Sequence, residues 1–226
     1  IAGRHDLYHA IHKGLRLGHC QMLASLGSHD FTDIAATATL IDELRLLIEL
    51  GRGHLESENR EIHSAIEARA PGASDHAAEG HDEHERWFAE LALLIVAVEQ
   101  ASAGDRAEAG RRLYKRYALF VAHDLAHMHE EETELLAALH TAFDDEELAA
   151  IEGRIVAAIP PAKMARYLML MVPALNRAER LSFMAKLKAG LPGAVFAGIL
   201  EGPVKQSLTA GEFTWLVGKL DMREAA

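Results

Sequence analysis

Four long stretches of helix-forming sequence, joined by short turns, limit what this chain can fold into. Ala, Leu and Glu are abundant and only 6% of the residues are aromatic, which favours helix over strand. Gly-, Pro- and Ser-containing turns stop the helical pattern at Gly27, at Pro71 and at Gly104. The expected helices cover approximately residues 4–26, 33–68, 74–103 and 105–142. Four such helices with short connections predict an all-α, up-down four-helix bundle.

The chain changes character at Asp145. Shorter apolar segments follow, such as YLMLMVPAL and GAVFAGIL, and they are interrupted by pairs such as Pro160-Pro161 and Gly202-Pro203. We therefore expect two parts, a helical bundle over 1–144 and additional C-terminal helical hairpins over 145–226. The second part carries no recognisable chemistry, so its role is open. It could provide the surface for a homodimer or for a protein partner.

Composition excludes several functions. The formal net charge of −11 argues against binding nucleic acid, because acidic surfaces repel phosphate. The longest uninterrupted apolar run, residues 91–98, is too short to cross a bilayer, so no membrane association is expected. With a single cysteine, Cys20, the chain forms no internal disulfide and no thiolate-rich metal site. A secretory leader is not evident, and we expect a cytoplasmic protein.

Fourteen histidines, all at or before residue 140, are the unusual feature of this sequence. Each of the four expected helices has an apolar line at the spacing i, i+3, i+4, i+7, and every line runs through at least one histidine. Two of the lines also carry a glutamate four residues after a histidine. The polar residues on these lines are His12, His54, Glu58, His81, His84, His127 and Glu131.

In an antiparallel bundle these side chains lie at similar depth near one end, because a helix rises about 1.5 Å per residue. A histidine and a glutamate four residues apart project from the same face, so one helix can supply two ligands to one site. Buried without a partner, such groups would cost several kcal/mol. Imidazole and carboxylate together suit iron, zinc, copper or manganese. We therefore expect the seven residues to bind metal.

The same pattern resembles the hemerythrin-like (HHE cation-binding) family. The likeness covers roughly residues 1–142 and rests on His12, His54-x3-Glu58, His81-x2-His84 and His127-x3-Glu131, together with the flanking stretches IHKGLR, HLESENREIH and HMHEEE. It implies a four-helix bundle around two non-haem iron ions that binds oxygen, nitric oxide or peroxide, or senses iron or redox state. The three-residue histidine spacing and the final glutamate are closer to the sensor and enzyme branches than to the oxygen carriers.

Several alternatives stay open. The iron could be replaced by zinc or manganese, His5 or His9 could take the place of His12, and either or both of His81 and His84 could be ligands. Whether the protein is an enzyme is also open, and no catalytic residue is assigned. A diiron oxidase or peroxidase and a helical interaction module with a structural metal are the competing functions. Tyr8 and Tyr117 lie near the ligand lines, and Asp124 is a candidate acceptor for an imidazole N–H. His123 is a less favoured ligand, and six further histidines are expected at the surface: His19, His29, His63, His76, His129 and His140.

Overall fold

The computed structural model describes residues 3–222, and this part of the chain is all-α, with no strand. The prediction of an all-α protein is therefore confirmed. Contacts divide the described residues into two units, which we treat separately. The larger unit comprises residues 3–8 and 18–157, and the smaller unit comprises residues 9–17 and 158–222.

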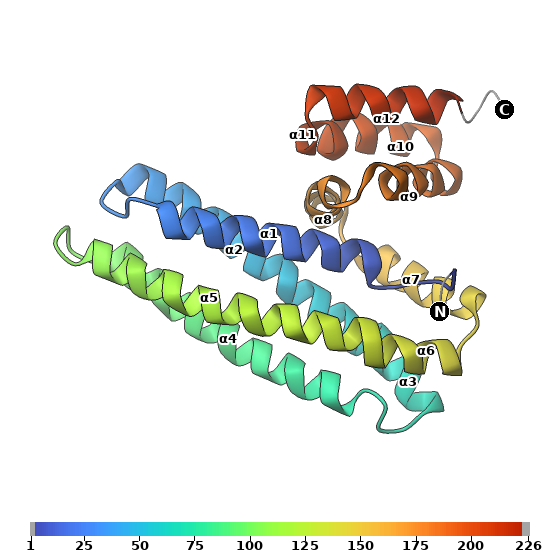
Figure 1. Cartoon of the computed structure of the whole chain (residues 1–226), viewed down its shortest axis with the longest axis horizontal. Helices are drawn as coiled ribbons and strands as arrows, with labels where there is room; N and C mark the ends of the chain where they lie inside the picture. Colours follow the sequence, from blue (N-terminus) through green and yellow to red (C-terminus); the bar gives the residue numbers. More distant parts are fainter. Residues whose placement is uncertain (1–2, 223–226) are drawn as a thin grey trace. The chain divides into compact units, whose positions relative to one another are not determined.

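The larger unit is built on long helices that run side by side (Figure 1). Helix α4 packs along α5 and also contacts α2. Two of the helical paths contain a short π-helical segment, and a shorter helix continues each path. The elements are the part of α1 (His9–Ser28) from residue 18 onward, α2 (Ile34–Ser57), η1 (Glu58–His63), α3 (Ser64–Arg69), α4 (Asp75–Gln100), α5 (Arg106–Glu130), η2 (Glu131–Leu135), α6 (Leu136–Ala142) and α7 (Asp145–Ala158).

Local sequence explains where these helices begin. The side chain of Asp33 caps α2 by accepting a hydrogen bond from the amide of Ala36 at 3.0 Å. Residues 4–8, which we expected to be helical, are not. The amide of Tyr8 donates instead to the side chain of Asp6 at 2.9 Å, and the guanidinium of Arg4 donates to the carbonyl of Phe143 at 2.8 Å. These bonds hold the segment in a turn and delay the start of α1.

An apolar cluster closes one end of the larger unit. Leu148 and Ile151 of α7 are buried there against Leu139 of α6 and Ile66 of α3. The phenol ring of Tyr8 belongs to the same cluster and is fully buried. Helix α7 therefore completes the core of this unit, although it follows the expected boundary at residue 144. Whether 1–144 and 145–226 are separate functional domains stays a prediction.

The smaller unit consists of short helices and the first turns of α1. Asn176 starts α9 with a reciprocal capping box, in which its side chain and that of Glu179 satisfy each other's backbone amides. The buried guanidinium of Arg180 donates to the carbonyls of Val172 and Leu175, both at 2.8 Å. The elements are α8 (Pro161–Ala174), α9 (Arg177–Gly190), α10 (Gly193–Ile199), η3 (Leu200–Val204), α11 (Lys205–Ser207) and α12 (Ala210–Met222).

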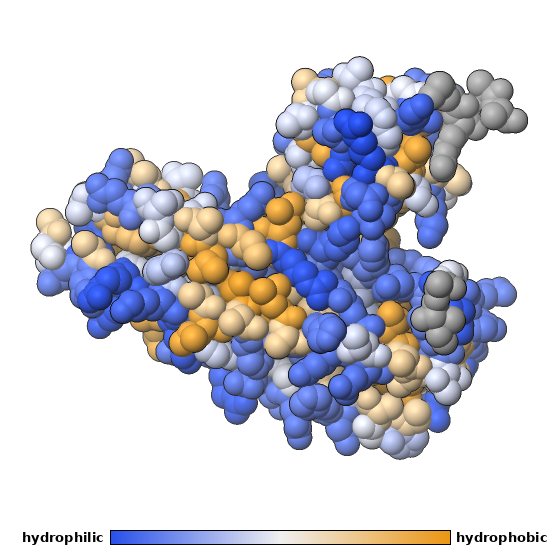
Figure 2. Space-filling model, in the orientation of Figure 1, coloured by the Kyte–Doolittle hydropathy of each residue, from blue (hydrophilic) through white to orange (hydrophobic). Residues whose placement is uncertain are grey.

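Most of the viewed surface is polar. Figure 2 shows hydrophobic side chains gathered mainly over the α1 and α5 face, among charged ones. Leu119 of α5 is 58% exposed. No helix between residues 3 and 222 combines the length and the apolarity that crossing a bilayer requires.

Candidate metal centre

Both glutamates of the predicted site begin a π-helical segment. Glu58 starts η1 at the end of α2, and Glu131 starts η2 at the end of α5. Each glutamate is only 1% exposed. A π-turn adds one residue to the helical repeat and is frequent at functional sites. In both helices the repeat therefore changes at the point where a carboxylate is buried.

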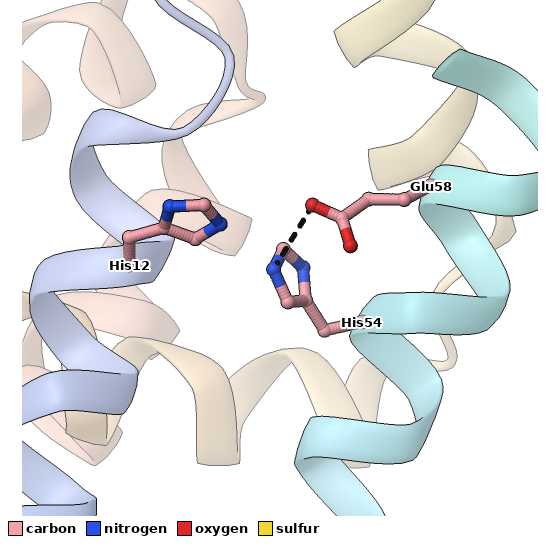
Figure 3. A group of neighbouring side chains, drawn as sticks. All are labelled: His12, His54 and Glu58. Carbon is pink, nitrogen blue, oxygen red and sulfur yellow. Dashed lines mark ion pairs between the residues drawn. The ribbon is translucent and has the colours of Figure 1, made fainter. Parts of the chain in front are cut away.

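The first buried group contains His12, His54 and Glu58, with ligand atoms within 4.8 Å of one another (Figure 3). His54 and Glu58 lie one turn apart, and Nε2 of His54 is 3.1 Å from Oε1 of Glu58. His12 comes from α1 and is fully buried, whereas His54 is partly exposed. The group thus offers two imidazoles and one carboxylate, a set that could hold a metal ion.

The second group contains His63, His81 and Glu131, all buried, again with ligand atoms within 4.8 Å of one another. Nε2 of His81 lies 3.3 Å from Oε1 of Glu131 and 3.6 Å from Oε2 of Glu58. Its Nδ1 is 2.7 Å from the side-chain oxygen of Asn59. That contact keeps the proton of a neutral imidazole on Nδ1 and leaves Nε2 as the acceptor that a metal requires. A neutral His81 with its proton on Nδ1 could therefore offer Nε2 to a metal ion beside the two glutamates.

His63 corrects the sequence-based expectation, because it is 5% exposed and not a surface residue. Its imidazole stacks on that of His81, with ring centroids 4.7 Å apart and an angle of 15° between the planes. Within the described part of the chain, both of its ring nitrogens are buried and lack a hydrogen-bond partner. Leaving a buried polar group unsatisfied costs about 1–3 kcal/mol. Two such nitrogens beside His81 and Glu131 fit a site built for a cation.

His127 adjoins the second group without being one of its three members. Its Nε2 lies 3.3 Å from Oε1 of Glu131, and its ring meets those of His81 and His84 at centroid distances of 4.9 and 4.7 Å. The ring fits only because residue 80 is glycine. A Cβ atom there would lie 2.6 Å from Nδ1 of His127.

His84 lies in a different buried network. Its Nδ1 is 2.8 Å from the carbonyl oxygen of Gly80, and its Nε2 is 3.0 Å from Oδ1 of Asp124. The other oxygen of Asp124 lies 3.7 Å from Nε2 of His19, whose Nδ1 is 2.7 Å from the hydroxyl of Tyr117. Asp124, a candidate acceptor for an imidazole N–H, is thus buried and lies at hydrogen-bond distance from His84. His84 joins neither buried group, because both of its ring nitrogens have protein partners.

The expected surface histidines divide three ways. His76 and His129 are exposed, and His29 and His140 are half-buried. His19 and His63 are buried, contrary to expectation. His19 lies on the same face of α1 as His12, two turns further on, so the sequence spacing could have predicted its burial.

The pKa values of the buried His63, His127 and Tyr8 side chains shift in different directions. Burial lowers the pKa of the His63 imidazole, and the neighbouring His81 lowers it further, so the neutral form of His63 is favoured. Burial also lowers the pKa of His127, but Glu131, Glu58 and Asp124 together raise it above its ordinary value. Burial, followed by Glu131 and Glu58, raises the pKa of Tyr8 well above normal. The Tyr8 phenol therefore keeps its proton beside both carboxylates.

Comparison with known proteins adds no assignment: no family model matches the sequence, and neither a curated protein nor a solved structure matches it. Residues 3–222 are all-α and contain two buried His/Glu groups that could hold metal ions.

Proposed function

We propose that helices α1, α2, α4 and α5 form an up-down four-helix bundle of the hemerythrin-like kind that holds two transition-metal ions, with iron as the expected metal. The observation that carries this proposal is the position of Glu58. One of its oxygens faces His54 at 3.1 Å and the other faces His81 at 3.6 Å, so a single carboxylate connects the two groups. Bridging by glutamate is how helical bundles of the diiron class hold paired metals.

The residues present fit such a pair. His12, His54 and Glu58 would hold one ion, and His63, His81 and Glu131 the other, with His127 next to the second. The buried ring nitrogens of His63 have no other use among the described residues. We propose that His84 supports the site without binding metal itself. Its bonds to Gly80 and Asp124 fix its ring, which in turn contacts the ring of His127.

Bound iron would supply an open position and two accessible oxidation states, with which the protein binds or senses a small ligand such as oxygen, nitric oxide or peroxide. The protein itself contributes a buried site and a hydrogen-bond donor. Tyr8 is fully buried, and its phenol stays protonated next to Glu58 and Glu131. A hydrogen bond from this phenol can hold a small ligand at the site.

The same tyrosine favours a second candidate, a diiron oxidase or peroxidase. Turnover of peroxide or oxygen benefits from a hydrogen-bond donor beside the reacting atoms. Tyr8, whose phenol keeps its proton and interacts with both carboxylates, could be that donor. Catalytic consumption of peroxide that is lost in Tyr8→Phe, with metal content unchanged, would favour the enzyme over the sensor.

The test of metal binding is elemental analysis of protein purified without air, followed by its visible spectrum on exposure to oxygen and to nitric oxide. We expect about two iron ions per chain in the wild type and strongly reduced content in Glu58→Gln. Glu56→Gln is the matched control, because Glu56 is exposed on the same helix two residues earlier. One zinc ion per chain, or equal metal content in both variants, would contradict the proposal.

A further inference from the structure

A depression of about 530 Å³ lies on the larger unit between α4 and α5. Its wall carries four carboxylates, those of Glu79, Asp82, Glu83 and Glu130, against the single guanidinium of Arg86. A concave surface with an excess of one charge concentrates ions of the opposite charge and raises their rate of association. This depression therefore attracts cations.

Its mouth combines imidazole with carboxylate. Nε2 of His76 lies 3.2 Å from Oε2 of Glu130, and Nδ1 of the same ring lies 3.9 Å from Oε2 of Glu79. The three side chains are 71%, 44% and 84% exposed, in that order, so solvent ions reach them freely. Exposed nitrogen and oxygen ligands of this kind bind first-row divalent ions weakly.

The inner wall leads to the buried groups. His127 lines the depression, is only 4% exposed, and has its Nε2 3.3 Å from Oε1 of Glu131. One imidazole thus separates the depression from a buried carboxylate. Gly80 also lines the depression, and its lack of a Cβ atom leaves the space beside the wall that the His127 ring occupies.

We propose that divalent transition-metal ions reach and leave the buried groups through this depression. His76, Glu79 and Glu130 take up the hydrated ion, and His127 passes it inward to Glu131. This inference rests on the proposed function, because it needs a buried metal site as the destination. It adds the face of the molecule through which that site is loaded.

The test is the rate of Co²⁺ uptake by the metal-free full chain, followed by visible absorption in a stopped-flow instrument. The E79Q/E130Q double variant should load roughly five- to tenfold more slowly at low salt, because the local charge that steers the ion is reduced. Added salt should shrink the difference. The final amount of bound cobalt should equal that of wild type. The control E56Q/E134Q removes the same charge from exposed positions outside the depression.

A second pair of variants tests the path itself. Ala126 is exposed and lines the depression, whereas Ala122, one turn earlier on α5, is exposed outside it. Ala126→Leu should slow both cobalt uptake and its removal by a chelator and leave the dissociation constant unchanged, while Ala122→Leu should behave as wild type. Uptake at the wild-type rate in both E79Q/E130Q and Ala126→Leu would overturn the proposed route. A wild type that binds no cobalt would instead overturn the metal site itself.

Discussion

Replacing Gly80 with alanine tests the tightest contact of the candidate site. A Cβ atom at residue 80 would lie 2.6 Å from Nδ1 of His127, whereas ordinary contacts of Cβ atoms begin near 3.4 Å. The imidazole would therefore have to move by about 0.8 Å, the difference between these two distances. Such a movement is not free, because His127 is buried between His81 and His84 and faces Glu131.

Two effects of opposite sign determine how much Gly80→Ala changes the free energy of unfolding. Alanine inside a helix is more stable than glycine by roughly 0.5–1 kcal/mol. Overpacking a buried site costs about 1–3 kcal/mol. Gly51→Ala isolates the first effect, because a Cβ atom there would meet Phe88 at an ordinary 3.5 Å. We expect Gly51→Ala to stabilise the protein and Gly80→Ala to be less stable than Gly51→Ala by about 1–3 kcal/mol.

The assay is urea unfolding of the metal-free protein, followed by far-UV circular dichroism. Both glycines lie in the larger unit, so the same transition is compared. A double-mutant cycle with His127→Ala then locates the clash. Once the imidazole is removed, Gly80→Ala should stabilise as Gly51→Ala does. If Gly80→Ala is already stabilising in the presence of His127, the close contact does not constrain the ring and the reasoning is wrong.

Three further outcomes are expected. His63→Gln should weaken binding of the second metal ion at least roughly tenfold, as measured by titration with Co²⁺, since a direct ligand matters no less than its supporting partners; unchanged affinity would exclude His63 from the site. In the metal-free protein, NMR titration should place the pKa of His63 below the ordinary value of 6.5 and that of His127 above it. Protonation of His63 opposes folding, so its contribution to the free energy of unfolding increases as the pH rises to the pKa of the unfolded chain. The contribution of His127 is complete at low pH and is lost as the pH rises through its raised pKa. A His63 that titrates at higher pH than His127 would contradict both statements. Gly110→Ala should destabilise by about 1–3 kcal/mol in urea unfolding, because its Cβ would lie 2.2 Å from the ring of Phe31, whereas Gly153→Ala meets nothing within 4 Å and should not destabilise.

Helix periodicity predicted the parts of the site that depend on one helix at a time. His54 with Glu58, and His127 with Glu131, are pairs four residues apart, and their facing atoms lie at 3.1 and 3.3 Å. Their proximity follows from the geometry of a single turn. The apolar line of α4 was equally predictable, and Phe88 on it is buried.

The tertiary partners of each imidazole were not predictable in this way. His84 lies on the buried line of α4 as expected, yet its nitrogens bind Gly80 and Asp124 and do not face the glutamates. A shift of a few degrees in helix rotation decides which partner a ring meets, and periodicity does not specify rotation so finely. The role of His84 as a ligand therefore stays a prediction.

The π-turns explain the remaining difference between sequence and structure. A strict helical repeat after Glu58 places Ala65 on the buried line, but Ile66 is the residue that is fully buried, and Ala65 is only half-buried. The extra residue of the turn shifts every later position by one.

The same shift buries two consecutive residues after each glutamate. They are Ile62 and His63 after Glu58, and Leu135 and Leu136 after Glu131. In η2 the amide of Leu136 bonds to the carbonyl of Glu131, five residues back, which is the bond that defines a π-turn. Three of the four residues join the apolar cluster that closes this end of the larger unit, and His63 alone is polar. A position that the turn makes available for packing is thus occupied on one helix by an imidazole without a hydrogen-bond partner among the described residues. Because leucine at the equivalent place packs well, core packing alone does not require a histidine there, and this supports the proposal that His63 coordinates a cation.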